Sequence, residues 1–393
     1  GLVAEWWLAS IACLLAAWLL LSFCLRGNDL PTALRNMALS LAPLSLQLSH
    51  SLTGRMGVPT QFVVLGDALT AGLLVGVAYA LWIAPLRLSP VRWMLRVLAD
   101  RRTPIALAIL WAAWIGSLSV FTWWNVKQYS QDMAIYEQAV YNALQGRGLV
   151  YSCDIRHSGV VMHRFADHFE PIIYMFIPLY ALWQSPVWFL LAQVALPASG
   201  ALAVALLARR WYPVPQAGTV FAIAYLLHPG LYSALTFDFH PVVLAAPLLL
   251  WALHLALTDR LWAAMGFFLL AMSCQESVAG TAFAAGGFLI CRSRGRLGIA
   301  VAVVALLWGL MAIGYVIPHF CPYGRGFYGD LLRVPLAGEH VTGALGVVTL
   351  LTKRWGYVID VLAPVGGLWL LSPCGALISL PEFALHLCSS NTW

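Results

Sequence analysis

The sequence carries very little charge for its length. Of its 393 residues, 10% are Asp, Glu, Lys or Arg and 61% are hydrophobic, whereas soluble globular domains carry about 25% charged residues. One water-soluble core cannot hide so much apolar surface. The composition therefore excludes a soluble enzyme, a nucleic-acid-binding protein, a disordered scaffold and a disulfide-stapled secreted domain. It leaves an all-α, polytopic helical membrane protein.

Lysine is nearly missing, and the cysteines form no recognisable site. Only Lys127 and Lys353 are lysines among the 22 basic residues. In a membrane protein an excess of arginine marks cytoplasmic loops and does not indicate a nucleic-acid partner. The eight cysteines contain no C-x-x-C pair and no zinc-ligand spacing. The chain ends at Trp393 inside an apolar pattern, so we expect it to be truncated at the C-terminus.

Long apolar runs are abundant, and about 20 such residues span a bilayer. Runs of this length are 3–25, 62–86, 104–124, 187–208, 241–258 and 297–317. Shorter or interrupted runs are 169–184, 214–228, 261–274, 277–291, 357–372 and 376–388. Together they predict about 10–12 membrane segments. A change of composition near 100–104 separates an N-terminal transmembrane hairpin with an interfacial segment, 1–103, from a larger transmembrane domain, 104–393.

The arginines predict which loops face the cytoplasm. The stretch 87–102 is rich in arginine and is placed inside, so helix 104–124 runs outward and 125–168 becomes an external loop. The arginines at 209–210, 260 and 292–296 are also expected inside. This requires that 169–184, a short run with two prolines, does not cross the bilayer. The stretch 261–291 is either one helix or a hairpin that turns at Gln275–Glu276, and the arginines favour the hairpin. A second external loop is expected at 318–356.

The same topology gathers titratable side chains at the outer face. It was fixed from arginines and segment lengths alone, so this convergence independently supports a site there. The gathered residues are Asp132, Glu137, Asp154, Asp167, Glu170, Asp238, Glu276, Asp330 and Glu339, with His157, His163, His168, His240, His319 and His340.

The first external loop opens with an amphipathic helix over 130–146. Its apolar stripe includes Tyr136 and Val140, and such a helix is expected to lie on the membrane surface. Asp132 in its first turn is a candidate catalytic carboxylate, although a plain N-cap is an alternative role. Glu137 is a second catalytic candidate and need not share the face of Asp132.

Three further polar stretches add candidates at the outer face. Asp167 and His168 are candidate ligands for a divalent cation such as Mg, Mn or Zn; a salt-bridge knot with Arg156 and Arg164 is the alternative. Asp238 and His240 precede Pro241 and are either substrate-binding or a buried structural pair. Glu276 lies between two apolar arms, which suggests a function unless it only caps a helix.

These stretches together carry a family resemblance. The quoted residues are Asp132-x-x-x-Tyr136-Glu137-Gln138-Ala139, Asp167-His168-Phe169-x-Pro171, Phe237-Asp238-x-His240-Pro241, Gln275-Glu276 and Leu380-Pro-Glu-Phe-x-Leu-x-Leu387. They resemble a bacterial family of multi-spanning membrane proteins of unassigned function, over about residues 104–393. That family is in turn similar to the GT-C superfamily of membrane glycosyltransferases, although Gln275 stands where many relatives have a basic residue.

The resemblance implies a membrane glycosyltransferase. Such an enzyme would move a sugar from a polyprenyl-phosphate carrier to an acceptor at the periplasmic or exterior face of the bacterial inner membrane. Asp132 would act as general base, and a metal at Asp167 and His168 or the guanidinium groups of Arg156 and Arg164 would neutralise the leaving phosphate.

Two other functions compete with this interpretation. A non-catalytic subunit of a larger membrane assembly, with partner membrane subunits, is the main alternative. A transporter is less favoured, because no internal repeat is visible and the acids gather at one face rather than at the midplane.

Overall fold

The computed structural model describes residues 89–125, 131–153, 160–228, 231, 234–235, 238–321, 378 and 380–381. Most of these residues are helical, and the protein is an all-α helical membrane protein. The chain divides into two compact units. Unit 1 comprises Gly1–Ala108, Val204–Tyr232 and Ile359–Leu371, and unit 2 comprises Ile109–Ala203, Ser233–Val358 and Ser372–Trp393. The predicted boundary at 103 therefore stays a prediction.

Unit 1 contains α4 (Ser89–Ala99), the start of α5 (Thr103–Trp124), the end of α8 (Val187–Trp211) and α9 (Ala217–Leu226). Helix α4 packs against α9, and the Gln216 amide donates to the carbonyl oxygen of Leu95 over 3.3 Å. Arg209 likewise donates to the carbonyl oxygen of Asp100 over 3.4 Å. Two of the arginine-rich stretches that were predicted to share the inner side therefore meet at one end of this unit.

The first external loop forms a small module in unit 2. Helix α6 (Gln131–Leu144) confirms the predicted amphipathic helix, with Met133, Ile135, Tyr136, Ala139 and Val140 buried. Strands β1 (Val150–Tyr151) and β2 (Met162–His163) pair antiparallel, Val150 opposite His163. Gly146 and Gly148 in the intervening turn have φ values of +73° and +79°, a conformation that glycine adopts without strain. The 3₁₀ turn η2 (Arg164–Ala166) follows.

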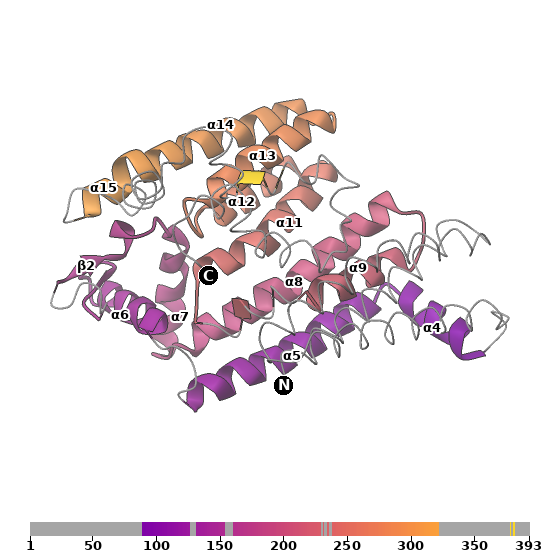
Figure 1. Cartoon of the computed structure of the whole chain (residues 1–393), viewed down its shortest axis with the longest axis horizontal. Helices are drawn as coiled ribbons and strands as arrows, with labels where there is room; N and C mark the ends of the chain where they lie inside the picture. Colours follow the sequence, from indigo (N-terminus) through magenta and orange to yellow (C-terminus); the bar gives the residue numbers. More distant parts are fainter. Residues whose placement is uncertain are drawn as a thin grey trace, which may run out of the picture. The chain divides into compact units, whose positions relative to one another are not determined.

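The membrane part of unit 2 is a set of packed helices. Side by side lie α11 with α12 and α13 with α14 (Figure 1). After α7 (Phe176–Leu182), which follows the 3₁₀ turn η3 (Pro171–Met175), the chain continues through α8 and then through η4 (Pro241–Leu244), α11 (Ala245–Leu257), α12 (Leu261–Met272), α13 (Val278–Cys291), α14 (Gly295–Met311), the π turn η5 (Ala312–Val316) and α15 (Ile317–Phe320).

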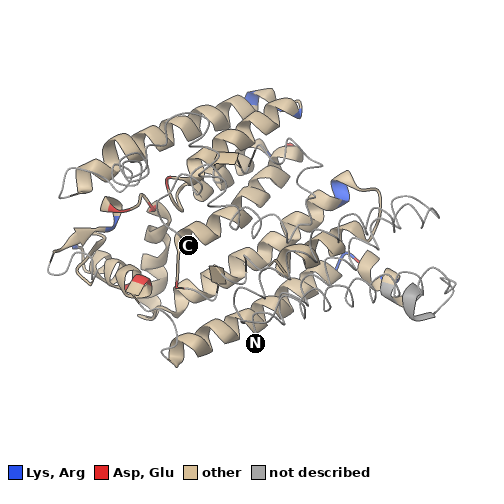
Figure 2. Ribbon diagram, viewed as in Figure 1, with Lys and Arg blue, Asp and Glu red and all other residues tan. Residues whose placement is uncertain are grey.

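The stretch 261–291 is a hairpin, as predicted. Helices α12 and α13 are separated by a turn at 273–277. At the end of the hairpin away from this turn, Arg294 forms an ion pair with Asp259 (Nη2 to Oδ2, 2.8 Å) and brings the start of α12 close to the end of α13. Within unit 2, Figure 2 shows basic residues at the N-terminal end of α14, while acidic residues lie near α6 and the chain that follows β2.

Three described helices are long and apolar enough to cross a membrane: α5, α8 and the continuous α14–η5–α15 segment. At 1.5 Å per residue, the 22 residues of α5 extend about 33 Å, slightly more than a bilayer core of about 30 Å. The run Pro171–Leu182 is a shorter apolar helix of about 20 Å, less than the thickness of a bilayer core, and its failure to cross the bilayer stays a prediction. The predicted segments 3–25, 62–86 and 357–372 and nearly all of 376–388 lie outside the described residues.

Candidate functional site

The N-terminus of α6 is capped by a side chain that lies 106 residues further along the chain. Asp238 Oδ2 accepts a hydrogen bond from the backbone N–H of Asp132 over 3.2 Å. Asp238 is fully buried, and its Oδ1 has no hydrogen-bond partner among the described residues. Burial raises the pKa of the Asp238 carboxyl, and the backbone N–H groups at the start of α6 partly oppose this rise. The carboxylate of Asp238 therefore helps to cap this helix.

Asp132 presents its carboxylate to His240. Its side chain is 35% exposed, and Oδ2 lies 3.3 Å from His240 Nε2. On the other side of the ring, Nδ1 lies 3.0 Å from the carbonyl oxygen of Asp238, which can only accept a hydrogen bond, so Nδ1 carries the proton. Burial lowers the pKa of His240, but hydrogen bonds to Asp132 and Asp238 outweigh burial and raise it. Gln193 fixes the backbone by accepting from the His240 N–H over 3.0 Å.

Arg164 lies at the centre of a buried network of hydrogen bonds and ion pairs. Its Nε donates to Glu170 Oε2 over 2.9 Å, and its Nη1 lies 3.3 Å from Asp167 Oδ2. Its Nη2 donates over 2.8 Å to the hydroxyl of Tyr136, which itself donates to Glu170. Tyr151 donates to the same Asp167 oxygen over 2.6 Å. Only 6% of Arg164 is exposed, so its donors serve the protein interior, as the salt-bridge alternative expected.

Glu276 ties the turn between α12 and α13 to the external loop. Its Oε1 lies 2.8 Å from His168 Nδ1, and its Oε2 accepts the N–H of Phe169 over 2.7 Å. Burial lowers the pKa of His168, but the adjacent Glu276 carboxylate outweighs burial and raises it. No side chain caps the start of α13. Glu276 therefore does not act as the helix cap that was its alternative role.

The predicted metal ligands point to protein partners. Asp167 binds Arg164 and Tyr151, whereas His168 binds Glu276. Among the described residues, no group of three or more His, Cys, Asp or Glu side chains is placed to hold a metal ion. Protein side chains thus engage both predicted ligands, and a metal at this position stays a prediction. Arg156 lies outside the described residues.

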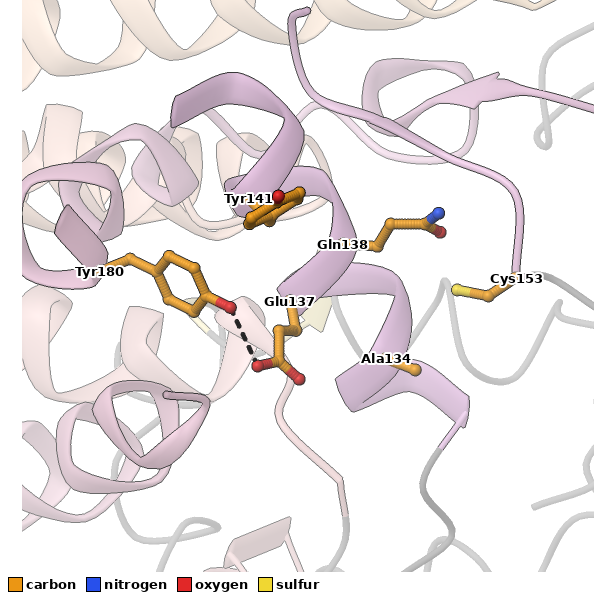
Figure 3. Close-up of a pocket in the computed structure, with 6 residues that line it drawn as sticks. All are labelled: Ala134, Glu137, Gln138, Tyr141, Cys153 and Tyr180. Carbon is orange, nitrogen blue, oxygen red and sulfur yellow. Dashed lines mark hydrogen bonds between the residues drawn. The ribbon is translucent and has the colours of Figure 1, made fainter. Parts of the chain in front are cut away.

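Glu137 lies on a different face of α6 and lines a pocket of about 290 Å³. The Tyr180 hydroxyl, from α7, donates to Glu137 Oε1 over 3.0 Å, while Oε2 points away from Tyr180 (Figure 3). Burial raises the pKa of the Glu137 carboxyl, and the Tyr180 hydrogen bond partly opposes this rise. The pocket is lined by Ala134, Glu137, Gln138, Tyr141, Cys153 and Tyr180. The two predicted catalytic carboxylates therefore have separate surroundings.

Several residues of these networks were given no role in the site from the sequence, although Glu170 was among the carboxylates expected at the outer face. Tyr136, Glu170 and Gln193 are buried and hold the candidate groups in place. Tyr136 belongs to the Asp132–Ala139 motif of the family resemblance, so the sequence could have indicated a role for it. Gln193 was detectable only as an amide within an otherwise apolar helix. No local pattern indicated the contact of Tyr180 with Glu137.

Comparison with known proteins finds one family. Residues 123–393 match the model of a family described as predicted membrane protein (DUF2079). No curated protein and no solved structure matches the chain.

Proposed function

The chain belongs to the DUF2079 family of predicted membrane proteins, and on this premise we propose that it is a membrane glycosyltransferase of the GT-C type. Its donor is a sugar linked to a polyprenyl phosphate, whose chain lies among membrane lipids, and transfer takes place at the outer face of the bacterial inner membrane. The resemblance of the quoted motifs to GT-C enzymes suggests this reaction. The Asp132–His240 pair supplies the chemical support.

The proposal rests on the position of the Asp132 carboxylate and on the side chains around it. Helix α6 holds its carboxylate, the carboxylate is partly exposed, and the side chain of Asp238 accepts the backbone N–H of Asp132. Capping alone would not require a second ionisable side chain beside the carboxylate. Asp132 instead has an imidazole beside it, the arrangement in which a third group orients an acid–base residue.

In the proposed reaction the sugar passes from the phosphate of the donor to a hydroxyl of the acceptor. The acceptor hydroxyl oxygen attacks the anomeric carbon and forms the new glycosidic bond, while its proton passes to Asp132. The bond between the anomeric carbon and the phosphate oxygen breaks, and its electron pair leaves with the polyprenyl phosphate. His240 orients Asp132, and Asp238 fixes the start of α6. Because Arg164 is already bonded to Glu170 and Asp167, we assign the leaving phosphate mainly to Arg156.

The test is sugar transfer from a polyprenyl-phosphate donor in membranes containing the protein. Asp132→Asn keeps the size of the side chain and leaves the backbone N–H that Asp238 accepts, so the fold should persist. Because the amide cannot take a proton, transfer should fall by about 10²–10⁴-fold, the usual worth of a positioned acid–base group. Asp259→Asn, at the far end of the α12–α13 hairpin, is the matched control and should transfer normally. Full transfer by Asp132→Asn would remove Asp132 from the mechanism.

A further inference from the structure

The pocket beside Glu137 is built from two parts of the external loop and from the neighbouring helix α7. Helix α6 contributes Ala134, Glu137, Gln138 and Tyr141, α7 contributes Tyr180, and Cys153 follows β1 (Figure 3). Its volume of about 290 Å³ is close to the lower limit for small-molecule sites, about 300 Å³. The pocket therefore suits one ring-sized group rather than a long chain.

The lining side chains are held in place by contacts outside the pocket. The Gln138 amide donates to Ser152 Oγ over 3.2 Å, and its carbonyl oxygen accepts the Ser152 N–H over 2.9 Å. The guanidinium group of Arg147 stacks over the ring of Tyr141, with its Cζ atom 5.7 Å from the ring centroid. Tyr180 holds one oxygen of Glu137 and leaves Oε2 without a hydrogen bond from any described residue. A ligand would thus meet a largely preformed surface, which lowers the entropic cost of binding.

The chemistry of this surface limits what can bind. Among the described residues that line the pocket, Glu137 is the charged one, and it would repel an anion. A wholly apolar group would desolvate the carboxylate without giving it a partner, which is costly. A group rich in hydroxyls satisfies Glu137 Oε2 through its O–H donors and can also bond the tyrosine hydroxyls and lay its C–H face on an aromatic ring.

We propose that this pocket binds a sugar ring of the acceptor, next to the acceptor ring whose hydroxyl attacks the donor sugar near Asp132. The inference rests on the proposed function and names its acceptor as a saccharide of more than one ring. Asp132 and Glu137 are five residues apart on α6, about 7.5 Å along the helix axis. The pocket thus lies beyond the reacting hydroxyl and serves positioning, not chemistry.

Two substitutions test this role in the membrane transfer assay. Ala134→Trp fills the pocket from an exposed position, and Glu137→Gln removes the charged acceptor while keeping the shape. Glu137→Gln should raise the KM for the membrane acceptor about ten- to a hundredfold, as expected for a lost hydrogen bond to a charged group. Ala134→Trp should raise the same KM by blocking the pocket. Both should leave the KM for the polyprenyl-phosphate donor unchanged. The control is Gln145→Trp, an exposed residue of the same loop outside the pocket, and it should behave like the wild type.

The outcomes separate the two proposals. If the wild-type protein transfers sugar and the Ala134→Trp protein shows an unchanged acceptor KM, the pocket does not bind the acceptor, although the transferase proposal stands. If Glu137→Gln lowers kcat without changing the acceptor KM, Glu137 acts in the chemistry and the positioning role is wrong. If the wild-type protein releases no sugar from the donor, both proposals fall.

Discussion

At the scale of single residues, the external loop is held together by charges that neutralise one another inside the protein. Arg164 contacts two carboxylates, and Glu276 contacts one histidine and one backbone N–H. Taking one partner from such a pair leaves the other charge buried without compensation, whereas replacing both partners by apolar groups is much better tolerated. This asymmetry makes the role of Arg164 testable.

Arg164→Leu should lower the free energy of unfolding by about 3–5 kcal/mol, because Glu170 is then buried without its cation. Replacing both partners, as in Arg164→Met with Glu170→Met, should recover much of that loss. Arg147→Leu is the control, since this arginine is exposed and only stacks on Tyr141. Thermal unfolding in detergent measures all three proteins. A double variant that is stable and yet transfers no sugar would show that the Arg164–Glu170 pair is needed for transfer as well as for stability.

At the scale of elements, helices α13 and α14 pack closely because both carry glycine at their contact. A Cβ atom at Gly286 would lie 2.7 Å from the carbonyl oxygen of Gly298, and one at Gly298 would lie 2.6 Å from that of Gly286. The neighbouring Gly287 has open space on its side of α13. The two adjacent glycines therefore have opposite roles in one helix.

Alanine at these two positions should change stability in opposite directions. Gly286→Ala forces the backbones of α13 and α14 apart and should cost about 1–3 kcal/mol. Gly287→Ala meets no atom and should stabilise the helix by about 0.4–1 kcal/mol, because it reduces the freedom of the unfolded chain. Melting temperatures of the two purified proteins compare them directly, and a shift of the same sign in both would contradict this packing.

The elements were the most predictable part of the molecule. Apolar runs located α5, α8, α11 and α14, and the arginines at 260 and 292–296 predicted the hairpin that Asp259 and Arg294 close. Side-chain partners were much less predictable. The capping of α6 by Asp238 and the bond between His168 and Glu276 join residues more than 100 positions apart, and no local spacing records such a contact. The sequence located the candidate residues of the site but not their pairing.

At the scale of the whole molecule, the sidedness of the loops remains a prediction that labelling can test. In a cysteine-depleted protein, Arg102→Cys and Arg292→Cys should resist a membrane-impermeant maleimide applied to intact cells, because arginine-rich ends stay in the cytoplasm. Gln145→Cys, just after α6, should react. All three should react in permeabilised cells. External labelling of Arg292→Cys would reverse the α12–α13 hairpin and move Glu276 to the inner side.

The central claim is that Asp132 and His240 lie where the sugar leaves the polyprenyl phosphate. The most direct measurement is a cryo-EM structure of the whole protein in a lipid nanodisc with a non-hydrolysable polyprenyl-phosphate sugar bound. The proposed function predicts density for the anomeric carbon within reach of the Asp132 carboxylate, with the phosphate on the opposite side of that carbon. Density for the sugar phosphate at the other end of the α12–α13 hairpin, near Asp259 and Arg294, would contradict it.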